Sequence, residues 1–280
     1  MTDDVEEKNK TEEQILNPWK ESDYLEKWNA NAYLTSFCQQ INGQWLPVMY
    51  PLVSNINELL QTKLNKKEQI VLEFGGGPCL WGSLLLAEYF DQIWFCDFAP
   101  SNLKSIQDWL DKKPDAFNWK PFFNYVLDIK QGHHHNEFEY ETKLRSALRN
   151  GKIFRCDVNR INSLFIDSPN DQQKFQMIFS SFCLESACSS YDILKQTILR
   201  FSDLLESGGM LLICSFKNST SYTFNGDTFT DLPLSPDIIR NAFLETGHLT
   251  EPTCISLDSQ PNPTYGITNH EIMINYGFKI

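Results

Sequence analysis

The 280-residue chain holds 36 acidic against 24 basic residues, a formal net charge of −12, with 41% hydrophobic and 21% charged residues. These proportions are typical of a globular protein, and the negative surface that they imply repels a phosphate backbone, which argues against a nucleic-acid partner. No apolar run approaches a membrane span and the charged N-terminus has no apolar signal core, so we expect a cytoplasmic protein without membrane contact, and a monomer.

The N-terminal part predicts a short tail followed by a helical cover. Residues 1–14 are charged and poor in large apolar groups, which is typical of a disordered tail. Trp19, Tyr24, Trp28 and Tyr33 then recur at roughly helical spacing. We expect a single domain over 15–280 whose first part, about 15–65, is a helical cap, because no linker or internal repeat divides the rest.

Short apolar runs alternate with amphipathic runs through the remainder of the chain. The apolar runs predict strands at 69–74, 92–98, 152–158, 175–182 and 210–216. The amphipathic runs predict helices at 80–90, 101–113, 139–151, 191–209 and 234–247. The expected helix ends are Ser101 and Ser235 as N-caps, Pro236 in a first turn, and Gly151, Gly208 and Gly209 at C-termini.

Two further apolar runs, 251–259 and 270–280, flank a loop rich in Pro, Asn and Thr, and predict a terminal antiparallel hairpin. Strands that alternate with helices predict an α/β fold with a mostly parallel sheet that carries helices on both faces. The fold class expected from the pattern alone is therefore a doubly covered, mostly parallel sheet.

The cysteines and histidines predict no metal site. Eight cysteines lie mostly inside apolar runs with no C-x-x-C pair, as expected for buried, reduced thiols. His133, His134 and His135 are adjacent within a polar stretch over 128–139, and neighbouring side chains of an extended segment point to opposite faces. We interpret this stretch as a solvated loop.

The segment VLEFGGGPCLW, residues 71–81, places a glycine turn directly after the first strand of the sheet. Gly75 and Gly77 let the backbone approach a ligand closely, but Leu80 takes the place of the third glycine of the G-x-G-x-x-G dinucleotide fingerprint. The turn therefore favours a nucleoside without a diphosphate and disfavours a nicotinamide-dinucleotide oxidoreductase.

Two aspartates are placed to bind the sugar and the base of such a nucleoside. Asp97 ends the second strand, twenty residues after Gly77, where a carboxylate accepts from both ribose hydroxyls. Asp157 closes the third strand, within reach of the base. S-adenosylmethionine is the common ligand of this shape. The less favoured alternative is an ordinary tight turn with two aspartates that cap helices.

Several segments resemble, in chain order, the family of small-molecule N-methyltransferases that includes the nicotinamide, phenylethanolamine and indolethylamine enzymes. They are DYLEKW, GGGP, CDFAPSNLKSIQDWLDKKPDAFNW, CDV, SSFCLESAC, LLESGGMLLI and FTDLPL, and the likeness runs from about Asn17 to the C-terminus. The resemblance implies a class I, Rossmann-like S-adenosylmethionine-dependent methyltransferase with a seven-stranded sheet and an N-terminal cover that closes over both ligands. The cofactor residues that it implies are Tyr24, Gly75, Gly77, Trp81, Asp97, Asn102, Asp157, Val158 and Ser181.

The chain departs from the family pattern at two positions near the glycine turn. Glu73 stands where Asp is usual, and Trp81 stands where Tyr is usual. Both substitutions keep the chemical character, so the expected cofactor is unchanged.

Glu185 of FCLESA is the expected catalytic carboxylate. Methyl transfer moves positive charge from the sulfonium onto the acceptor nitrogen, and a nearby carboxylate stabilises that charge. Tyr24 is the second expected catalytic residue, placed with Trp81 to stack around the sulfonium or a substrate ring, and Phe182 provides an apolar wall. The alternative role of Glu185 is a cap in the first turn of the next helix.

The stretch FKNSTSY bears on the identity of the acceptor. Asn218 stands where the phenylethanolamine enzyme has a second glutamate. The Lys and Ser of this stretch are closer to those of the nicotinamide enzyme. Tyr222 completes the expected substrate residues. The loss of that carboxylate favours nicotinamide or another pyridine over a small aryl-alkyl amine. A non-catalytic relative that binds the cofactor is a further alternative, disfavoured because the chain retains the expected site residues.

Overall fold

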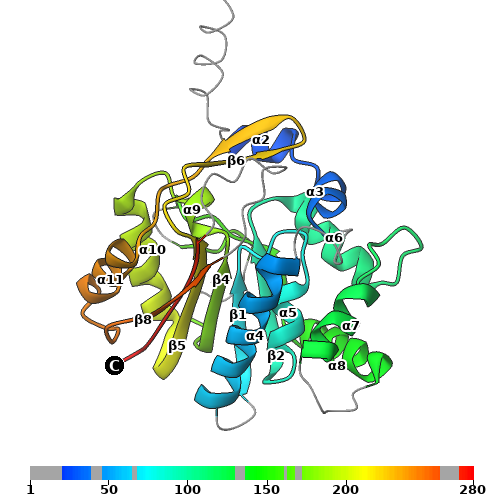
Figure 1. Cartoon of the computed structure of the whole chain (residues 1–280), viewed down its shortest axis with the longest axis horizontal. Helices are drawn as coiled ribbons and strands as arrows, with labels where there is room; N and C mark the ends of the chain where they lie inside the picture. Colours follow the sequence, from blue (N-terminus) through cyan, green and yellow to red (C-terminus); the bar gives the residue numbers. More distant parts are fainter. Residues whose placement is uncertain are drawn as a thin grey trace, which may run out of the picture.

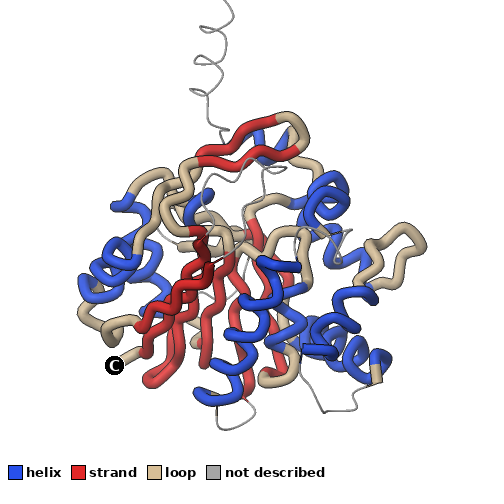
Figure 2. The backbone as a smooth tube through the Cα atoms, viewed as in Figure 1, coloured by secondary structure: helices blue, strands red, loops and turns tan. Residues whose placement is uncertain are grey.

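The computed structural model of the chain describes residues 21–38, 46–64, 68–129, 136–160, 163–167, 172–258 and 271–280. The expected disordered tail at 1–14 and the histidines of the expected solvated loop lie outside these ranges. Figures 1 and 2 show the described elements from one direction, with the strands at the centre and helices around them.

A seven-stranded sheet forms the centre of the fold, as the sequence predicts (Figure 2). The strand order is β3-β2-β1-β4-β5-β9-β8, in which β1 to β5 are parallel and β9 runs antiparallel to its two neighbours. The last two strands confirm the expected terminal hairpin. The bounds are β1 Glu68–Phe74, β2 Phe90–Asp97, β3 Ile153–Arg155, β4 Phe175–Ser181, β5 Leu205–Phe216, β8 Thr253–Asp258 and β9 Glu271–Phe278.

Helices cover both faces of this sheet, which explains why its central strands are mostly apolar and buried. The bounds are α2 Glu21–Glu26, α3 Ala30–Phe37, α4 Leu46–Lys63, α5 Trp81–Leu86, α6 Pro100–Leu110, α7 Lys120–Ile129, α8 Glu137–Asn150, α9 Leu184–Ala187, α10 Tyr191–Leu204 and α11 Pro236–Glu245. Successive strand residues face opposite layers: Val71 packs in a core with α3 to α8, whereas Leu72 and Phe74 pack in a core with α9, α10 and α11.

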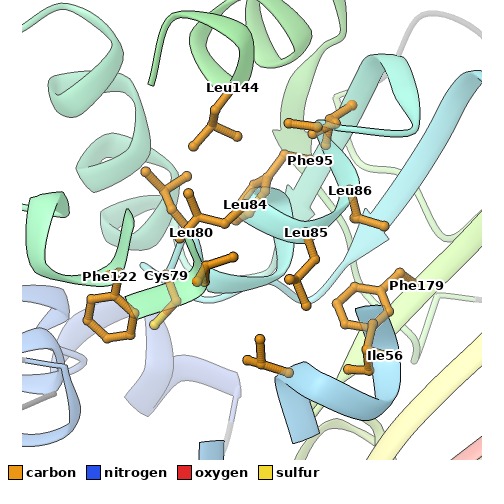
Figure 3. Packing of buried hydrophobic residues seen from close by; sticks show 14 of the residues in the cluster. Ile56, Cys79, Leu80, Leu84, Leu85, Leu86, Phe95, Phe122, Leu144 and Phe179 are labelled. Atoms are coloured by element: carbon orange, nitrogen blue, oxygen red, sulfur yellow. The ribbon is translucent and has the colours of Figure 1, made fainter. Parts of the chain in front are cut away.

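The short helix α5 links the sheet to the larger of these two cores. Figure 3 shows its leucines between Ile56 of α4 and Leu144 of α8, with Phe95 and Phe179 of the sheet beside them. Because α5 directly follows the glycine turn, this packing holds the turn against the end of β1.

Two helix ends differ from the expected ones. Helix α6 begins at Pro100 with Ala99 as N-cap, not Ser101, because Pro100 fits the first helical position, where its missing N–H costs no hydrogen bond. Helix α10 ends at Leu204, before Gly208 and Gly209, because Leu205 already pairs with β4. The Ser235 cap is confirmed, since its side chain accepts from Ile238 N–H at 3.3 Å.

Two elements of the structure were not predicted from the sequence. Helix α7 and the first residues of α8 take up both ends of the expected loop at 128–139. The other is a hairpin of β6 Ser221–Phe224 and β7 Asp227–Thr230, joined by Asn225 and Gly226 with φ of 53° and 85°. Asn-Gly is the favoured sequence for such a two-residue turn.

Within the described part of the chain, no helix combines the length and the apolar character needed to cross a lipid bilayer.

A substitution at Gly151 tests the contact between α8 and the sheet. It ends α8 with φ −85° and ψ −150°, a conformation open to any residue, but a Cβ there would overlap the backbone carbonyl of Ile93 in β2. We expect Gly151→Ala to lower the free energy of unfolding by about 1–3 kcal/mol in urea titrations. Ser146→Ala, exposed on the same helix, is the control and should change it little. Equal stability of both variants would contradict this packing.

Candidate functional site

A cavity of about 730 Å³ opens at the carboxyl ends of the parallel strands. It lies where β1 and β4 are neighbours although the chain leaves β1 toward β2, and ligands bind at such a reversal of strand order. Helices α2 and α3 and the β6–β7 hairpin lie over this edge in Figure 1 and contribute Tyr24, Tyr33 and Tyr222 to the lining. The volume is in the range of small-molecule sites, roughly 300–1,000 Å³.

The glycine turn forms the floor of the cavity. Gly75 and Gly77 have φ of 70° and 65°, which only glycine adopts without strain. A Cβ at Gly75 would overlap the Sγ of Cys183, whereas a Cβ at Gly77 would meet no atom within 4 Å. The first glycine is therefore required for packing against the segment after β4, and the second leaves its backbone open to the cavity.

Asp97 holds this turn in place from the end of β2. Its Oδ2 accepts the N–H of Gly77 at 2.9 Å, and its Oδ1 accepts the N–H of Ala99 at 2.9 Å and Asn102 Nδ2 at 2.8 Å. Asn102 in turn accepts the indole N–H of Trp28 at 2.8 Å, which ties the cap to the same point. Burial raises the pKa of Asp97, and these donors oppose the rise.

Glu73 lies beneath the turn and does not line the cavity. Its carboxyl accepts the hydroxyl of Ser83 in α5, and burial raises its pKa to about 8. A Cβ at Gly82 would overlap its Oε1, so the longer glutamate side chain fills the space that this glycine leaves. The departure at Glu73 therefore supports the turn from behind.

Glu185 lies in the first turn of α9, lines the cavity and is 2% exposed. Its Oε1 accepts the N–H of Phe216 in β5 at 3.2 Å, while its Oε2 has no hydrogen-bond partner among the described residues. Burial, and secondarily the charge of Asp231, raise its pKa to about 8, which its own N–H and that of Phe216 oppose. The side chain thus reaches across to β5 as well as lying near the start of its own helix.

Aromatic rings form the walls around these carboxyls. Phe182 follows β4 in a left-handed conformation with φ 50°, and its ring stacks on Phe216 with centroids 4.7 Å apart. Trp81 lies 6.3 Å from the Phe182 ring, and the hydroxyls of Tyr24 and Tyr222 are hydrogen-bonded to each other. The left-handed backbone of Phe182 is strained, and strain of this kind is concentrated at functional sites.

The structure brings all but one of the predicted site residues together. Those that line the cavity are Tyr24, Gly75, Gly77, Trp81, Asp97, Asn102, Asp157, Val158, Ser181, Phe182, Glu185 and Tyr222. Asp157 lies two residues beyond the end of β3, which is shorter than expected, and its Oδ1 also accepts the N–H of Asn159 at 2.8 Å. Asn218 is not in the lining, because its N–H pairs with the carbonyl of Leu234 at 2.7 Å and its neighbour Ser219 faces the cavity instead.

Asp231, a buried carboxylate of the cavity lining, was not among the predicted site residues. It directly follows β7, and its two oxygens accept the hydroxyls of Ser186 at 2.6 Å and Ser219 at 2.8 Å. Asp231 belongs to the segment FTDLPL, which contributes to the family resemblance, but the resemblance implied no role for this aspartate. The described residues contain no group of three or more His, Cys, Asp or Glu arranged to hold a metal ion.

The fold is similar to solved S-adenosylmethionine-dependent methyltransferases. Magnesium protoporphyrin IX methyltransferase of Synechocystis PCC 6803, crystallised with bound S-adenosylmethionine, has a TM-score of 0.55 at 11% identity, over 92% of this chain and 94% of its own. A methyltransferase of Clostridium acetobutylicum ATCC 824 has a TM-score of 0.51 at 13% identity, over 89% and 97%. The expected fold class is confirmed.

Sequence relatives extend over most of the chain. Nicotinamide N-methyltransferase of Homo sapiens is 27% identical over 231 residues, 81% of this chain and 84% of the relative. Indolethylamine N-methyltransferase of Mus musculus is 25% identical over 240 residues, 84% and 88%, and phenylethanolamine N-methyltransferase of Homo sapiens is 25% identical over 178 residues, 64% and 62%. The model of the NNMT/PNMT/TEMT family matches residues 18–276, and the chain belongs to this family.

Proposed function

We propose that this protein transfers the methyl group of S-adenosylmethionine to a nitrogen of a small aromatic molecule. The sequence favours nicotinamide or another pyridine as acceptor, and a small aryl-alkyl amine is the alternative. The observation that carries the proposal is the pairing, in one cavity, of an open glycine turn held by Asp97 with the buried, partly unpaired carboxyl of Glu185.

The floor of the cavity fits the cofactor. S-adenosylmethionine supplies an electrophilic methyl group on a positively charged sulfur. The open backbone at Gly77 accommodates the close approach of a nucleoside, and Asp97 lies beside it as the acceptor for ribose hydroxyls. Asn102, Asp157, Val158 and Ser181 complete this side of the lining. We assign these residues, with Gly75, Trp81 and Tyr24, to the cofactor.

The α9 side of the cavity fits an aromatic acceptor. Phe182 and Tyr222 offer ring faces, and Glu185 lies beside them with an oxygen that no described residue satisfies. Glu185 is 2% exposed, so its carboxylate acts on the positive charge that develops on the acceptor nitrogen with little screening by solvent. A pyridine loses no proton in this reaction. An amine must lose one, and a carboxyl with a pKa of about 8 is a better proton acceptor than an ordinary glutamate.

The reaction itself provides the first test. Purified protein is titrated calorimetrically with S-adenosylmethionine and with its demethylated product, and a panel of pyridines and aryl-alkyl amines then competes for labelled cofactor, with products read by mass spectrometry. We expect binding of both cofactor forms and methylation of a nitrogen acceptor. Binding without any methylated product would favour the non-catalytic alternative, and no binding would refute the proposal. That the protein acts as a cytoplasmic monomer stays a prediction.

Asp97→Asn should weaken cofactor binding about 10- to 100-fold. The amide removes the charge that attracts the ribose hydroxyls. Its NH₂ group also faces N–H groups that donate to the carboxylate in the wild type, and the loss of these bonds loosens the turn. Calorimetry with S-adenosylmethionine measures the change. Asp115→Asn, an exposed carboxylate beyond α6, is the matched control and should bind like the wild type. An unchanged dissociation constant in Asp97→Asn would contradict the ribose assignment.

Glu185→Gln should lower kcat about 100-fold and leave the cofactor dissociation constant within about threefold. The Glu185 carboxyl is neutral below its pKa of about 8 and ionised above it, so wild-type activity should rise with pH toward that value. The positive cofactor lowers this pKa, which places the rise at or below pH 8.

The same rise should be missing from the pH profile of Glu185→Gln, whereas Glu206→Gln, at an exposed position of β5, should keep both the rate and the profile of the wild type. A Glu185→Gln enzyme with wild-type turnover would restore the helix-cap role of this residue.

A further inference from the structure

We propose that Asp231 is a second acceptor-binding carboxylate, and that the acceptor is an amine that enters the cavity as a cation. This inference rests on the proposed methyl transfer and names the class of its acceptor. It reverses the order that Asn218 favours in the sequence, because the fold supplies the second carboxylate from another segment.

Asp231 is held beside Glu185 by contacts between their two segments. Its Oδ1 accepts the hydroxyl of Ser186, the residue after Glu185, at 2.6 Å. The next residue, Leu232, donates its N–H to the carbonyl of Glu185 at 2.6 Å. The segment after β7 is thus bonded to α9 through both side chain and backbone, and both acids line the same end of the cavity.

The direction of the Asp231 side chain is set by its two serines. Ser219 donates to Oδ2 at 2.8 Å, opposite the Ser186 contact on Oδ1, so each carboxylate oxygen has one bond from the protein. An ionised carboxylate offers about four acceptor positions. Asp231 is 9% exposed, so its remaining positions are met by a ligand more readily than by bulk water.

The second observation is the unsatisfied oxygen of Glu185. Its Oε2 is buried and has no hydrogen-bond partner among the described residues, although the side chain lines the cavity. A buried polar atom left without a partner costs free energy unless a ligand completes it. Glu185 and Asp231 together therefore present acceptors, and no donors, when both are ionised.

The negative charge of Glu185 and Asp231 favours a cationic ligand. None of the described residues that line the cavity is a lysine, an arginine or a histidine. Two buried carboxyls without a basic partner repel each other, and a cationic ligand removes that repulsion. An ammonium brings a charge and three N–H donors, whereas the ring nitrogen of a pyridine brings neither. The carboxamide of nicotinamide offers donors but no charge.

The same pair accounts for the proton that an amine must lose. The ammonium gives one proton to a carboxylate, which becomes a carboxylic acid, and the freed electron pair forms the new N–C bond. The C–S bond of the methyl donor breaks with its electrons staying on sulfur. The product is a methylated ammonium, so positive charge is present at the acids before and after transfer, and the second carboxylate stabilises it while the first holds the proton.

The test compares Asp231→Asn with the wild type on 2-phenylethylamine, tryptamine and nicotinamide, with calorimetry of S-adenosylmethionine alongside. We expect the wild type to methylate an amine in preference to nicotinamide, and Asp231→Asn to raise KM for the amine about 10- to 100-fold. The cofactor dissociation constant should stay within about twofold, and Asp231→Glu should recover part of the loss. Asp227→Asn, exposed in β7, is the matched control and should behave like the wild type.

Three results would overturn the inference: a wild-type preference for nicotinamide, an equal loss for amine and pyridine in Asp231→Asn, or a loss of cofactor affinity as large as the loss for the amine. The last would place Asp231 at the cofactor's own positive charge. Failure of the proposed function is distinct, since no cofactor would then bind and no acceptor would react. If Asp231→Asn does not fold, Ser219→Ala removes one of the two bonds that orient the carboxylate and should raise the amine KM selectively.

Discussion

Three N–H groups converge on the buried carboxylate of Asp97, and the geometry of the whole site depends on this convergence. The donors come from the glycine turn at Gly77, from Ala99 at the start of α6, and from Asn102 one turn later. Because Asn102 also accepts from Trp28, the N-terminal cap is positioned by the same carboxylate. One buried carboxylate that accepts from both the glycine turn and the start of α6 can hold these two segments together, because its hydrogen bonds are stronger there than they are in water.

Two buried glutamates show how the same residue type serves different ends in this protein. The pKa values of Glu73 and Glu185 are both raised to about 8 by burial. Glu73 bonds to Ser83 behind the glycine turn and does not line the cavity, so its role is to support the turn. Glu185 keeps an unsatisfied oxygen at the cavity, with Asp231 beside its segment. Burial raises the pKa of both glutamates alike, so the raised pKa does not distinguish their roles. What distinguishes them is that an oxygen of Glu185 lacks a hydrogen-bond partner among the described residues.

Local patterns predicted most of the sheet and the cofactor side of the site. β1 and the turn after it follow from an apolar run that breaks into glycines, and Asp97 was placed by its position at the end of the next strand. The Asn-Gly turn between β6 and β7 is a hairpin signal in the sequence, but the contact of this hairpin with the cap, through Phe229 and Tyr24, has no local signal. Asp231 gave no local signal, since a single acid after a short edge hairpin looks like an ordinary solvated residue.

The sequence by itself determined the fold class, the family and the residues that follow the strands, because these depend on periodicity and on motifs that are contiguous in the chain. The tertiary structure alone decided that Gly75 packs against Cys183, that Trp28 reaches Asn102 and that Asp231 joins Glu185. These pairs are separated by 45 or more positions in the chain, and their contact follows from the order of strands in the sheet and from the closure of the cap and hairpin over its edge. No local spacing encodes such a contact, since the same segments would keep their patterns in any other arrangement.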